Sequence, residues 1–337
     1  MTGSSREMAR PFKELWRELG ASRDFFAVQG LPAPAPEATP EAYFAALGEA
    51  VLIEAGCSRE ELAARFGKFL AALGRIDAAP PVVASMTVRG GADKRGRPET
   101  LDITLVPGDV VALVGPTGSG KSRFLADVEW LADADTPTGR RVLLDGAPAD
   151  AARRLSLSGR LVAQLSQNMH FVMDMAVGPF LCAHAESRLL ADPDRAAAEV
   201  TALANELAGE PFDAATPLTA LSGGQSRALM IADVARLCAS PVVLVDEIEN
   251  AGIDRRRAIA LLTGSGKIVL VATHDPLLAL LASRRLVFSG GAVAHTLETS
   301  PAERRALAEL AALDAVLTRA REDLRLGRTV AAHKETH

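Results

Sequence analysis

The chain has 337 residues, of which 48% are hydrophobic and 23% charged, and its net charge is −5. This length suffices for one large or two modest domains with a buried core, and the acidic balance argues against a dominant nucleic-acid-binding surface. The three scattered cysteines fit reduced thiols better than a disulfide framework. The N-terminus has no apolar stretch of the kind a signal peptide needs, and no apolar run reaches the ~18 residues of a membrane-spanning helix. We therefore expect a cytoplasmic protein without direct membrane insertion and without a nucleic-acid partner.

Residues 1–77 are predicted to form a small helical domain. Apolar residues recur at helical spacing over residues 10–20, and Thr39-Pro40 is a favourable helix start. Ser58-Arg-Glu-Glu61 has the pattern of a capping box at the beginning of another helix. A Pro/Ala-rich linker at residues 78–82 follows.

The pattern changes at residue 83, where short strand-like runs begin to alternate with helical stretches. This alternation predicts an α/β domain with a largely parallel sheet over residues 83–299. Within it, residues 171–237 are expected to form an almost wholly helical subdomain. The expected strands are 82–88, 101–105, 109–114, 141–144, 161–163, 242–245, 268–272 and 285–288.

Residues 300–337 are predicted to form a C-terminal helix and tail. Ser300-Pro-Ala-Glu303 is a helix start signal, and leucines follow it at spacings of three and four residues. This stripe fits packing on the body of the same chain, and it also fits contact with a partner or a second copy. Its members are Leu307, Leu310, Leu313, Leu317 and Leu324.

The segment Gly115–Ser122 reads Gly-Pro-Thr-Gly-Ser-Gly-Lys-Ser, directly after an apolar strand and before a helical run. Glycines allow a tight turn whose backbone N–H groups point at phosphate oxygens, and the following helix adds its positive N-terminus. In such a loop the lysine reaches the β- and γ-phosphates and the last hydroxyl ligates Mg²⁺. We expect ATP and Mg²⁺ as cofactors. The predicted nucleotide contacts here are Gly115, Pro116, Thr117, Gly118, Ser119, Gly120, Lys121 and Ser122.

A second apolar strand ends in the carboxylates Asp246 and Glu247. Next to a phosphate loop, Asp246 is expected to hold Mg²⁺ through water and Glu247 to orient and polarise the attacking water. Glu247 is therefore a predicted catalytic residue.

Leu221-Ser-Gly-Gly-Gln225 lies shortly before this pair, and with it the sequence resembles the ATP-binding-cassette (ABC) ATPases. Further motifs of that family follow in order over about residues 83–290. Gln167 resembles the Q-loop glutamine, with Gln164 as a competing candidate. His274 resembles the switch histidine, although a buried core histidine is the plainer interpretation. Asp254 resembles the D-loop aspartate.

The resemblance implies a P-loop ABC cassette: a mostly parallel sheet with an antiparallel β part and a helical signature subdomain, here with an added N-terminal helical domain. It implies that two cassettes, the second being another copy of the chain or a related subunit, sandwich two ATP molecules head to tail. Ser222 and Gly224 of one would then contact the γ-phosphate bound by Lys121 of the other. Catalysis is assigned to Glu247, His274 and Gln167, and Mg²⁺ binding to Ser122, Gln167 and Asp246. The remaining nucleotide contacts are Ser222, Gly223, Gly224, Gln225 and Asp254.

The sequence departs from the transporter pattern in two places. The segment from Glu247 to Asp254 is one residue longer than usual and lacks its proline, which affects the predicted D-loop geometry. No aromatic residue lies between Val82 and Gly115, where transporter cassettes stack the adenine. The base is then expected to contact an aliphatic residue such as Val88 or a residue of the N-terminal domain.

Two kinds of partner fit the ATPase cycle. The main interpretation is a cassette dimer that remodels a soluble enzyme or cofactor-assembly system, because of the extra domain, the altered D-loop and the missing aromatic. The alternative is the ATP-binding subunit of an ABC membrane transporter, peripheral to the inner membrane. In that case the apolar residues after Gln167, among them Met169, Met173 and Met175, would receive a permease instead of packing in the core.

Overall fold

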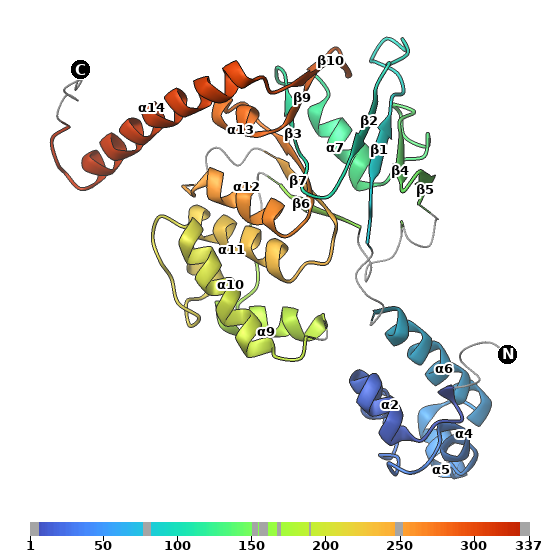
Figure 1. Ribbon diagram of the computed structural model, residues 1–337. Helices are drawn as coiled ribbons and strands as arrows, with labels where there is room; N and C mark the ends of the chain where they lie inside the picture. Colours follow the sequence, from blue (N-terminus) through green and yellow to red (C-terminus); the bar gives the residue numbers. More distant parts are fainter. Residues whose placement is uncertain are drawn as a thin grey trace. The chain divides into compact units, whose positions relative to one another are not determined.

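The computed structural model divides the chain into two compact units, Met1–Pro80 and Pro81–His337 (Figure 1). Each unit has a hydrophobic core of its own. The structure describes residues 7–76, 82–149, 154, 161–166, 170–188, 190–246 and 252–330.

Unit 1 is helical, as predicted. Thr39 caps α4, and its Oγ1 accepts a hydrogen bond from the Ala42 N–H at 3.2 Å. The predicted capping box is present at α6: the Ser58 N–H donates to Glu61 Oε2 at 2.9 Å, and the Glu61 N–H donates to Ser58 Oγ at 3.2 Å. The elements are α2 (Phe12–Glu18), η1 (Gly20–Arg23), α3 (Asp24–Val28), α4 (Pro40–Ala45), α5 (Glu49–Ala55) and α6 (Arg59–Ile76).

Aromatic rings fill the core of unit 1. Phe12 is completely buried and stacks on Trp16 with ring centroids 5.5 Å apart. Phe66 of α6 lies edge-on to Phe25 at 5.0 Å, which ties the long helix to the shorter ones. Ring pairs of this kind stabilise by more than their buried area alone, so a small unit with few residues still has a well-packed centre.

Unit 2 contains two sheets, and the predicted fold class is confirmed. The first is antiparallel, with strand order β2-β1-β4-β5. The second has order β10-β9-β3-β8-β7-β6 and is parallel except for the edge strand β10. The strands are β1 (Met86–Arg89), β2 (Asp102–Leu105), β3 (Val110–Val114), β4 (Arg141–Leu144), β5 (Ala147–Pro148), β6 (Val162–Leu165), β7 (Val242–Asp246), β8 (Ile268–Ala272), β9 (Arg284–Ser289) and β10 (Ala292–Glu298).

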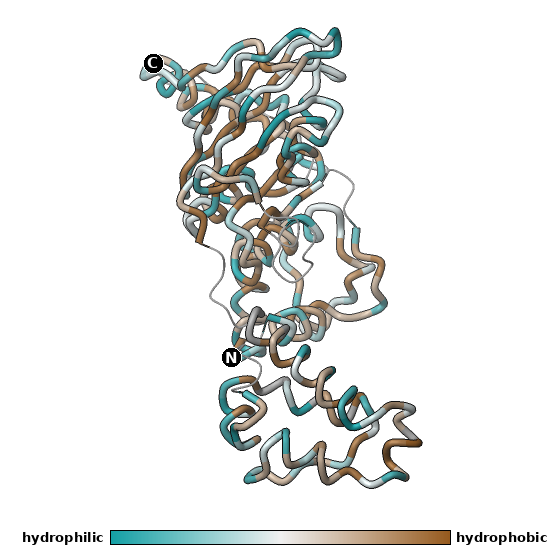
Figure 2. Tube along the Cα trace, turned by 90° about the vertical axis from the view of Figure 1, so that its right-hand side faces the viewer, coloured by the Kyte–Doolittle hydropathy of each residue, from teal (hydrophilic) through white to brown (hydrophobic). Residues whose placement is uncertain are grey.

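The central strands β3, β7 and β8 are buried on both faces, as is typical of strands that are continuous apolar runs. Hydrophobic stretches of the chain are brown in Figure 2. Along β7, Val242 and Leu244 pack in the same core as α7 (Lys121–Glu129) and the antiparallel sheet. Val243 and Val245 point the other way, into the core of the helical subdomain. The sheet is thus the middle layer between two different helical coverings.

The helical subdomain begins later than predicted. Its first helix starts at Val177, six residues after the approximate predicted start at residue 171, and residues 171–176 form an irregular segment. Met175 packs against the subdomain core, whereas Val172 is 91% and Met173 45% exposed. Met169 lies outside the described residues. The elements are α9 (Val177–Ser187), α10 (Pro193–Leu207), η2 (Leu218–Ala220), α11 (Gly223–Arg236) and α12 (Arg255–Gly264).

Helix α14 (Pro301–Arg325) follows β10 and the short helix α13 (Pro276–Leu281) lies beside it (Figure 1). Its predicted start signal is present, because the Ser300 N–H donates to Glu303 Oε2 at 2.8 Å. The stripe packs on the same chain only at its beginning: Leu307 and Leu310 are half-buried, whereas the leucines further along are exposed. Those exposed leucines are Leu313, Leu317 and Leu324. Among the described residues, no helix is long and apolar enough to cross a membrane.

A buried ionic network joins the antiparallel part to α7. Arg140 is fully buried and donates to both oxygens of Glu99, at 2.7 and 3.0 Å, and to Asp127 Oδ2 of α7 at 3.0 Å. Burial acts to lower the pKa of Arg140, but the bonds to Glu99 and Asp127 outweigh it and the pKa is raised. The one guanidinium of Arg140 thus bonds two buried carboxylates, and Asp127 Oδ2 also accepts from the Thr138 hydroxyl at 2.8 Å. Among the described residues, Asp127 Oδ1 has no hydrogen-bond partner.

We predict that Arg140→Met lowers the free energy of unfolding of unit 2 by about 3–5 kcal/mol, because Glu99 and Asp127 would be left as uncompensated buried charges. Urea denaturation followed by circular dichroism measures the change. Arg141→Met is the matched control, since the next side chain is 59% exposed and only 3.5 Å from Asp133 in a surface pair. Equal stability of the two variants would show that the network contributes little.

Candidate functional site

The phosphate loop connects β3 to α7 through backbone conformations that only glycine adopts easily. Gly115 has φ +145°, and a Cβ there would lie 2.6 Å from the Phe288 carbonyl oxygen. Gly120 has φ +117° and caps α7, and a Cβ there would lie 2.9 Å from Gly291 Cα. Any side chain at these positions would clash with backbone, so the loop keeps this path only with glycine.

Lys121 is the first residue of α7 and is 7% exposed. Its Nζ donates to the carbonyl oxygens of Gly115 at 2.6 Å and Pro116 at 3.3 Å, so the ammonium lies along the inner side of the loop. His274 Nε2 is 3.3 Å from the same Nζ. The structure therefore brings together two predicted site residues that are far apart in the sequence.

The strand order explains why these residues meet. β3, β8, β7 and β6 are consecutive and parallel, so their carboxyl ends share one edge of the sheet. The phosphate loop follows β3, His274 follows β8, and Asp246 ends β7 directly opposite Ala272 of β8. Loops at such an edge form the usual ligand crevice of parallel sheets.

Two predicted site residues, Gln167 and Glu247, lie outside the described residues. Each follows, in sequence, a strand that ends at the same edge: Gln167 comes after β6, and Glu247 directly after Asp246 of β7. The competing candidate, Gln164, is within β6 itself, in register with Leu244.

The signature segment begins helix α11. Ser222 Oγ accepts from the Gln225 N–H at 3.3 Å, and the Ser222 N–H donates to Gln225 Oε1 at 2.9 Å, which completes a capping box. Gly223 is exposed and Gly224 half-buried. Within this chain's described residues, none of the hydrogen bonds of the signature segment goes to the phosphate loop.

Asp254 is the N-cap of α12, where its Oδ1 accepts from the Arg257 N–H at 3.1 Å. The neighbouring Arg255 donates to Asp275 at 2.6 Å and to Asp314 of α14 at 2.9 Å. Because Asp275 follows His274, one arginine links the start of α12, the segment after β8 and the C-terminal helix.

The residues present fit a magnesium ion bound together with a nucleotide. Ser122 is exposed on the first turn of α7, and Asp246 is half-buried at the end of β7. The described residues contain no group of three His, Cys, Asp or Glu side chains that could hold a metal ion. Magnesium in nucleotide sites takes one or two protein oxygens and completes its shell with phosphates and water, which agrees with a serine and one carboxylate.

The suggested adenine contact through Val88 is wrong. Val88 is completely buried in β1 and packs in the core shared with the parallel sheet. β1 reads Met-Thr-Val-Arg, and its burial alternates with this pattern, so Val88 lies on the same inward face as Met86.

Sequence analysis also missed strand β10 and the turn Gly290-Gly291 before it, which lies against the phosphate loop. Two glycines between apolar runs are the signal of a tight hairpin and would have predicted it.

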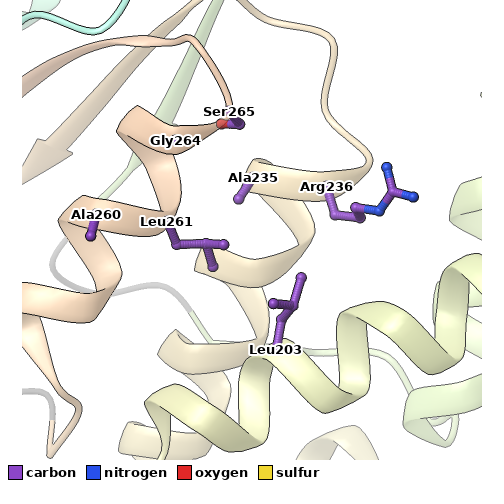
Figure 3. A pocket seen from close by; sticks show the side chains of 7 residues that line it. All are labelled: Leu203, Ala235, Arg236, Ala260, Leu261, Gly264 and Ser265. Atoms are coloured by element: carbon purple, nitrogen blue, oxygen red, sulfur yellow. The ribbon is translucent and has the colours of Figure 1, made fainter.

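Two hollows lie away from this edge. One of about 310 Å³ is between α10, α11 and α12, lined by Leu203 and Leu261 among others (Figure 3). Another of about 680 Å³ lies between α9 and α10. Neither contains a predicted site residue, so the candidate site is the loop edge.

Comparison with known proteins agrees with this geometry. The family model described as ABC transporter matches residues 99–250. An uncharacterized ABC transporter ATP-binding protein of Methanocaldococcus jannaschii is 46% identical over 246 residues, which cover 73% of this chain and 94% of that protein. A zinc import ATP-binding protein of Paracoccus denitrificans is 28% identical over 200 residues, covering 57% of this chain and 68% of that protein.

A solved component of an ABC transporter complex from Clostridium perfringens is similar over 73% of this chain and 97% of its own length, with 21% identity and a TM-score of 0.49. The identity over nearly the whole Methanocaldococcus relative is the deciding observation. The chain belongs to the family of ABC transporter ATP-binding proteins and is an ABC-type ATPase.

Proposed function

We propose that the chain is the ATP-binding subunit of an ABC membrane transporter, in which ATP binding and hydrolysis between two cassettes move a separate permease. The observation that supports this most is the 46% identity to an ABC transporter ATP-binding protein of which the chain covers 94%. The soluble-partner interpretation has no support from the relatives, whose names refer to transporters.

In this proposal the nucleotide phosphates lie against the N–H groups of Gly115–Ser122 and the N-terminus of α7. Lys121 is already on the inner side of the loop, bonded to two backbone carbonyls. When phosphates arrive, its ammonium can exchange these carbonyls for the more strongly accepting β- and γ-phosphate oxygens. His274 lies within reach of the same group and would contact the γ-phosphate.

Ser122, Asp246 and Gln167 would hold Mg²⁺, which supplies charge neutralisation on the phosphates when bound. Glu247 would accept the proton of the attacking water and orient it. Glu247 follows Asp246 directly in the sequence, and Asp246 ends β7 at the shared strand edge. Asp254 would act at the interface with the second cassette.

The signature would act on the other subunit's nucleotide. Ser222 is exposed at the N-terminus of α11, and Gly223 and Gly224 add N–H groups that no Cβ shields. In a head-to-tail pair of copies these groups would contact the γ-phosphate bound by Lys121 of the opposite subunit, together with Gln225. ATP then holds the dimer closed, and hydrolysis releases it.

The exposed segment after the Q-loop is the surface proposed for the permease. Val172 and Met173 are exposed, while Met175 anchors the same segment in the subdomain core. Apolar side chains exposed beside an anchored one are typical of a protein contact surface.

We predict that Glu247→Gln slows ATP hydrolysis by ~10²- to 10⁴-fold, because the amide cannot accept the proton from water. The variant should accumulate as an ATP-bound dimer that elutes early in size-exclusion chromatography. Glu249→Gln is the control, because it makes the same glutamate-to-glutamine change two residues later in the sequence. Hydrolysis by Glu247→Gln at the wild-type rate would exclude this residue as the base.

The partner is tested by affinity purification of the tagged chain from native cells, in parallel from the soluble fraction and from detergent-solubilised membranes. We expect integral membrane proteins to co-purify from the membrane fraction in stoichiometric amount. Recovery of a soluble enzyme alone, with no membrane protein, would contradict the transporter proposal while leaving the ATPase assignment intact.

A further inference from the structure

The outer side of the phosphate loop is held by two donors from other parts of the chain. Lys94 Nζ, from the loop between β1 and β2, donates to the Gly118 carbonyl oxygen at 2.7 Å. The Gly291 N–H, from the turn between β9 and β10, donates to the Ser119 carbonyl oxygen at 2.8 Å. Two successive carbonyls of the loop are therefore bonded to groups outside the loop, whereas Lys121 bonds the carbonyls of Gly115 and Pro116.

These bonds determine the direction of the opposite N–H groups. In a planar trans peptide the C=O of one residue and the N–H of the next point in opposite directions. With the Ser119 carbonyl bonded to Gly291, the Gly120 N–H faces the inner side of the loop. With the Gly118 carbonyl bonded to Lys94, the Ser119 N–H also turns inward, where it closes a turn onto Pro116 O at 3.1 Å.

The two donors are connected to each other and to the buried network. The Lys94 N–H donates to the Gly290 carbonyl at 3.1 Å, so the loop and the turn are bonded directly. Arg140 donates to the Gly291 carbonyl at 3.1 Å while Glu99 and Asp127 hold its guanidinium. The peptide group between Gly290 and Gly291 is thus hydrogen-bonded through both its C=O, to Lys94, and its N–H, to Ser119. A peptide group held at both ends has little freedom to rotate.

Close packing leaves no room for the loop to move outward. A Cβ on Gly291 would lie 2.7 Å from Lys94 Cγ, and a Cβ on Gly120 would lie 2.9 Å from Gly291 Cα. The stem of Lys94 therefore packs on the turn as well as placing its ammonium at Gly118.

We propose that Lys94 is a positioning residue for nucleotide binding: together with the Gly291 N–H it holds the phosphate loop in its anion-accepting shape before the nucleotide arrives. The inference rests on the proposed binding of ATP at Gly115–Ser122. When the loop already has its binding conformation, none of the free energy of nucleotide binding is lost in ordering the loop. Loss of the Lys94 bond therefore weakens ATP binding without altering the groups that act on the bound phosphates.

The test compares Lys94→Met, Lys94→Arg and Arg95→Met in the full-length protein by steady-state ATPase kinetics and thermal melting. Arg95 is the matched control: it lies on the same exposed loop, and among the described residues its side chain has no recorded hydrogen bond or ion pair. Lys94→Met should raise KM for MgATP about 3- to 10-fold, the range of one solvent-exposed hydrogen bond in net terms. Turnover and melting temperature should stay near wild-type values.

Lys94→Arg should restore KM, since a guanidinium can also donate to the Gly118 carbonyl, and Arg95→Met should leave it unchanged. An unchanged KM in Lys94→Met, or an equal rise in Lys94→Met and Arg95→Met, would overturn the proposal, the latter by showing a general effect of charge. Lys121→Ala, measured in parallel, tests the proposed nucleotide site separately from the role of Lys94. If Lys121→Ala binds ATP as the wild type does, the site itself is misassigned.

Discussion

The rest of unit 2 depends on one constraint, which is the direction of the peptide groups in Gly115–Ser122. A loop that binds phosphate must turn its N–H groups inward, and each inward N–H requires that the preceding carbonyl be satisfied on the outside. Lys94 and Gly291 supply donors for two of these carbonyls. Gly115 and Gly120 accept the backbone angles that result, and Arg140 connects the outer turn to the buried carboxylates.

The motifs could be recognised in the sequence because each is a contiguous group. The phosphate loop, Asp246 and His274 also each lie at or just after the end of an apolar strand. The bounds of β4 and β8 were also predictable, since continuous apolar runs bounded by polar residues indicate buried strands. Lys94, Arg140 and Gly291 could not be predicted as neighbours of the loop. They come from three separate segments that only the pairing of the strands in both sheets brings together. The spacing of apolar residues along the sequence does not predict which distant segments lie side by side.

The errors have physical causes as well. The residues after the Q-loop are apolar enough to suggest helix, yet residues 171–176 are irregular. Met175 packs against the subdomain core while Val172 is exposed, and the composition of the segment does not show which side chain does which. The leucine stripe lies within the helix α14 over its whole length, but only the first leucines are half-buried. The spacing of the leucines alone does not show that the short helix α13 packs beside only part of α14. The placement of Gln167 and Glu247 lies outside the described residues, and their roles stay predictions from the family pattern.

The central claim is that the loop binds the β- and γ-phosphates of a nucleotide. Calorimetric titration with AMP, ADP and ATP in the presence of Mg²⁺ tests it most directly, because the three ligands share the base and the ribose. The account predicts that ADP and ATP bind at least ~100-fold more tightly than AMP, since several charge-assisted hydrogen bonds of ~1.5–3 kcal/mol each form only with the outer phosphates. Equal affinity for AMP and ATP would contradict it.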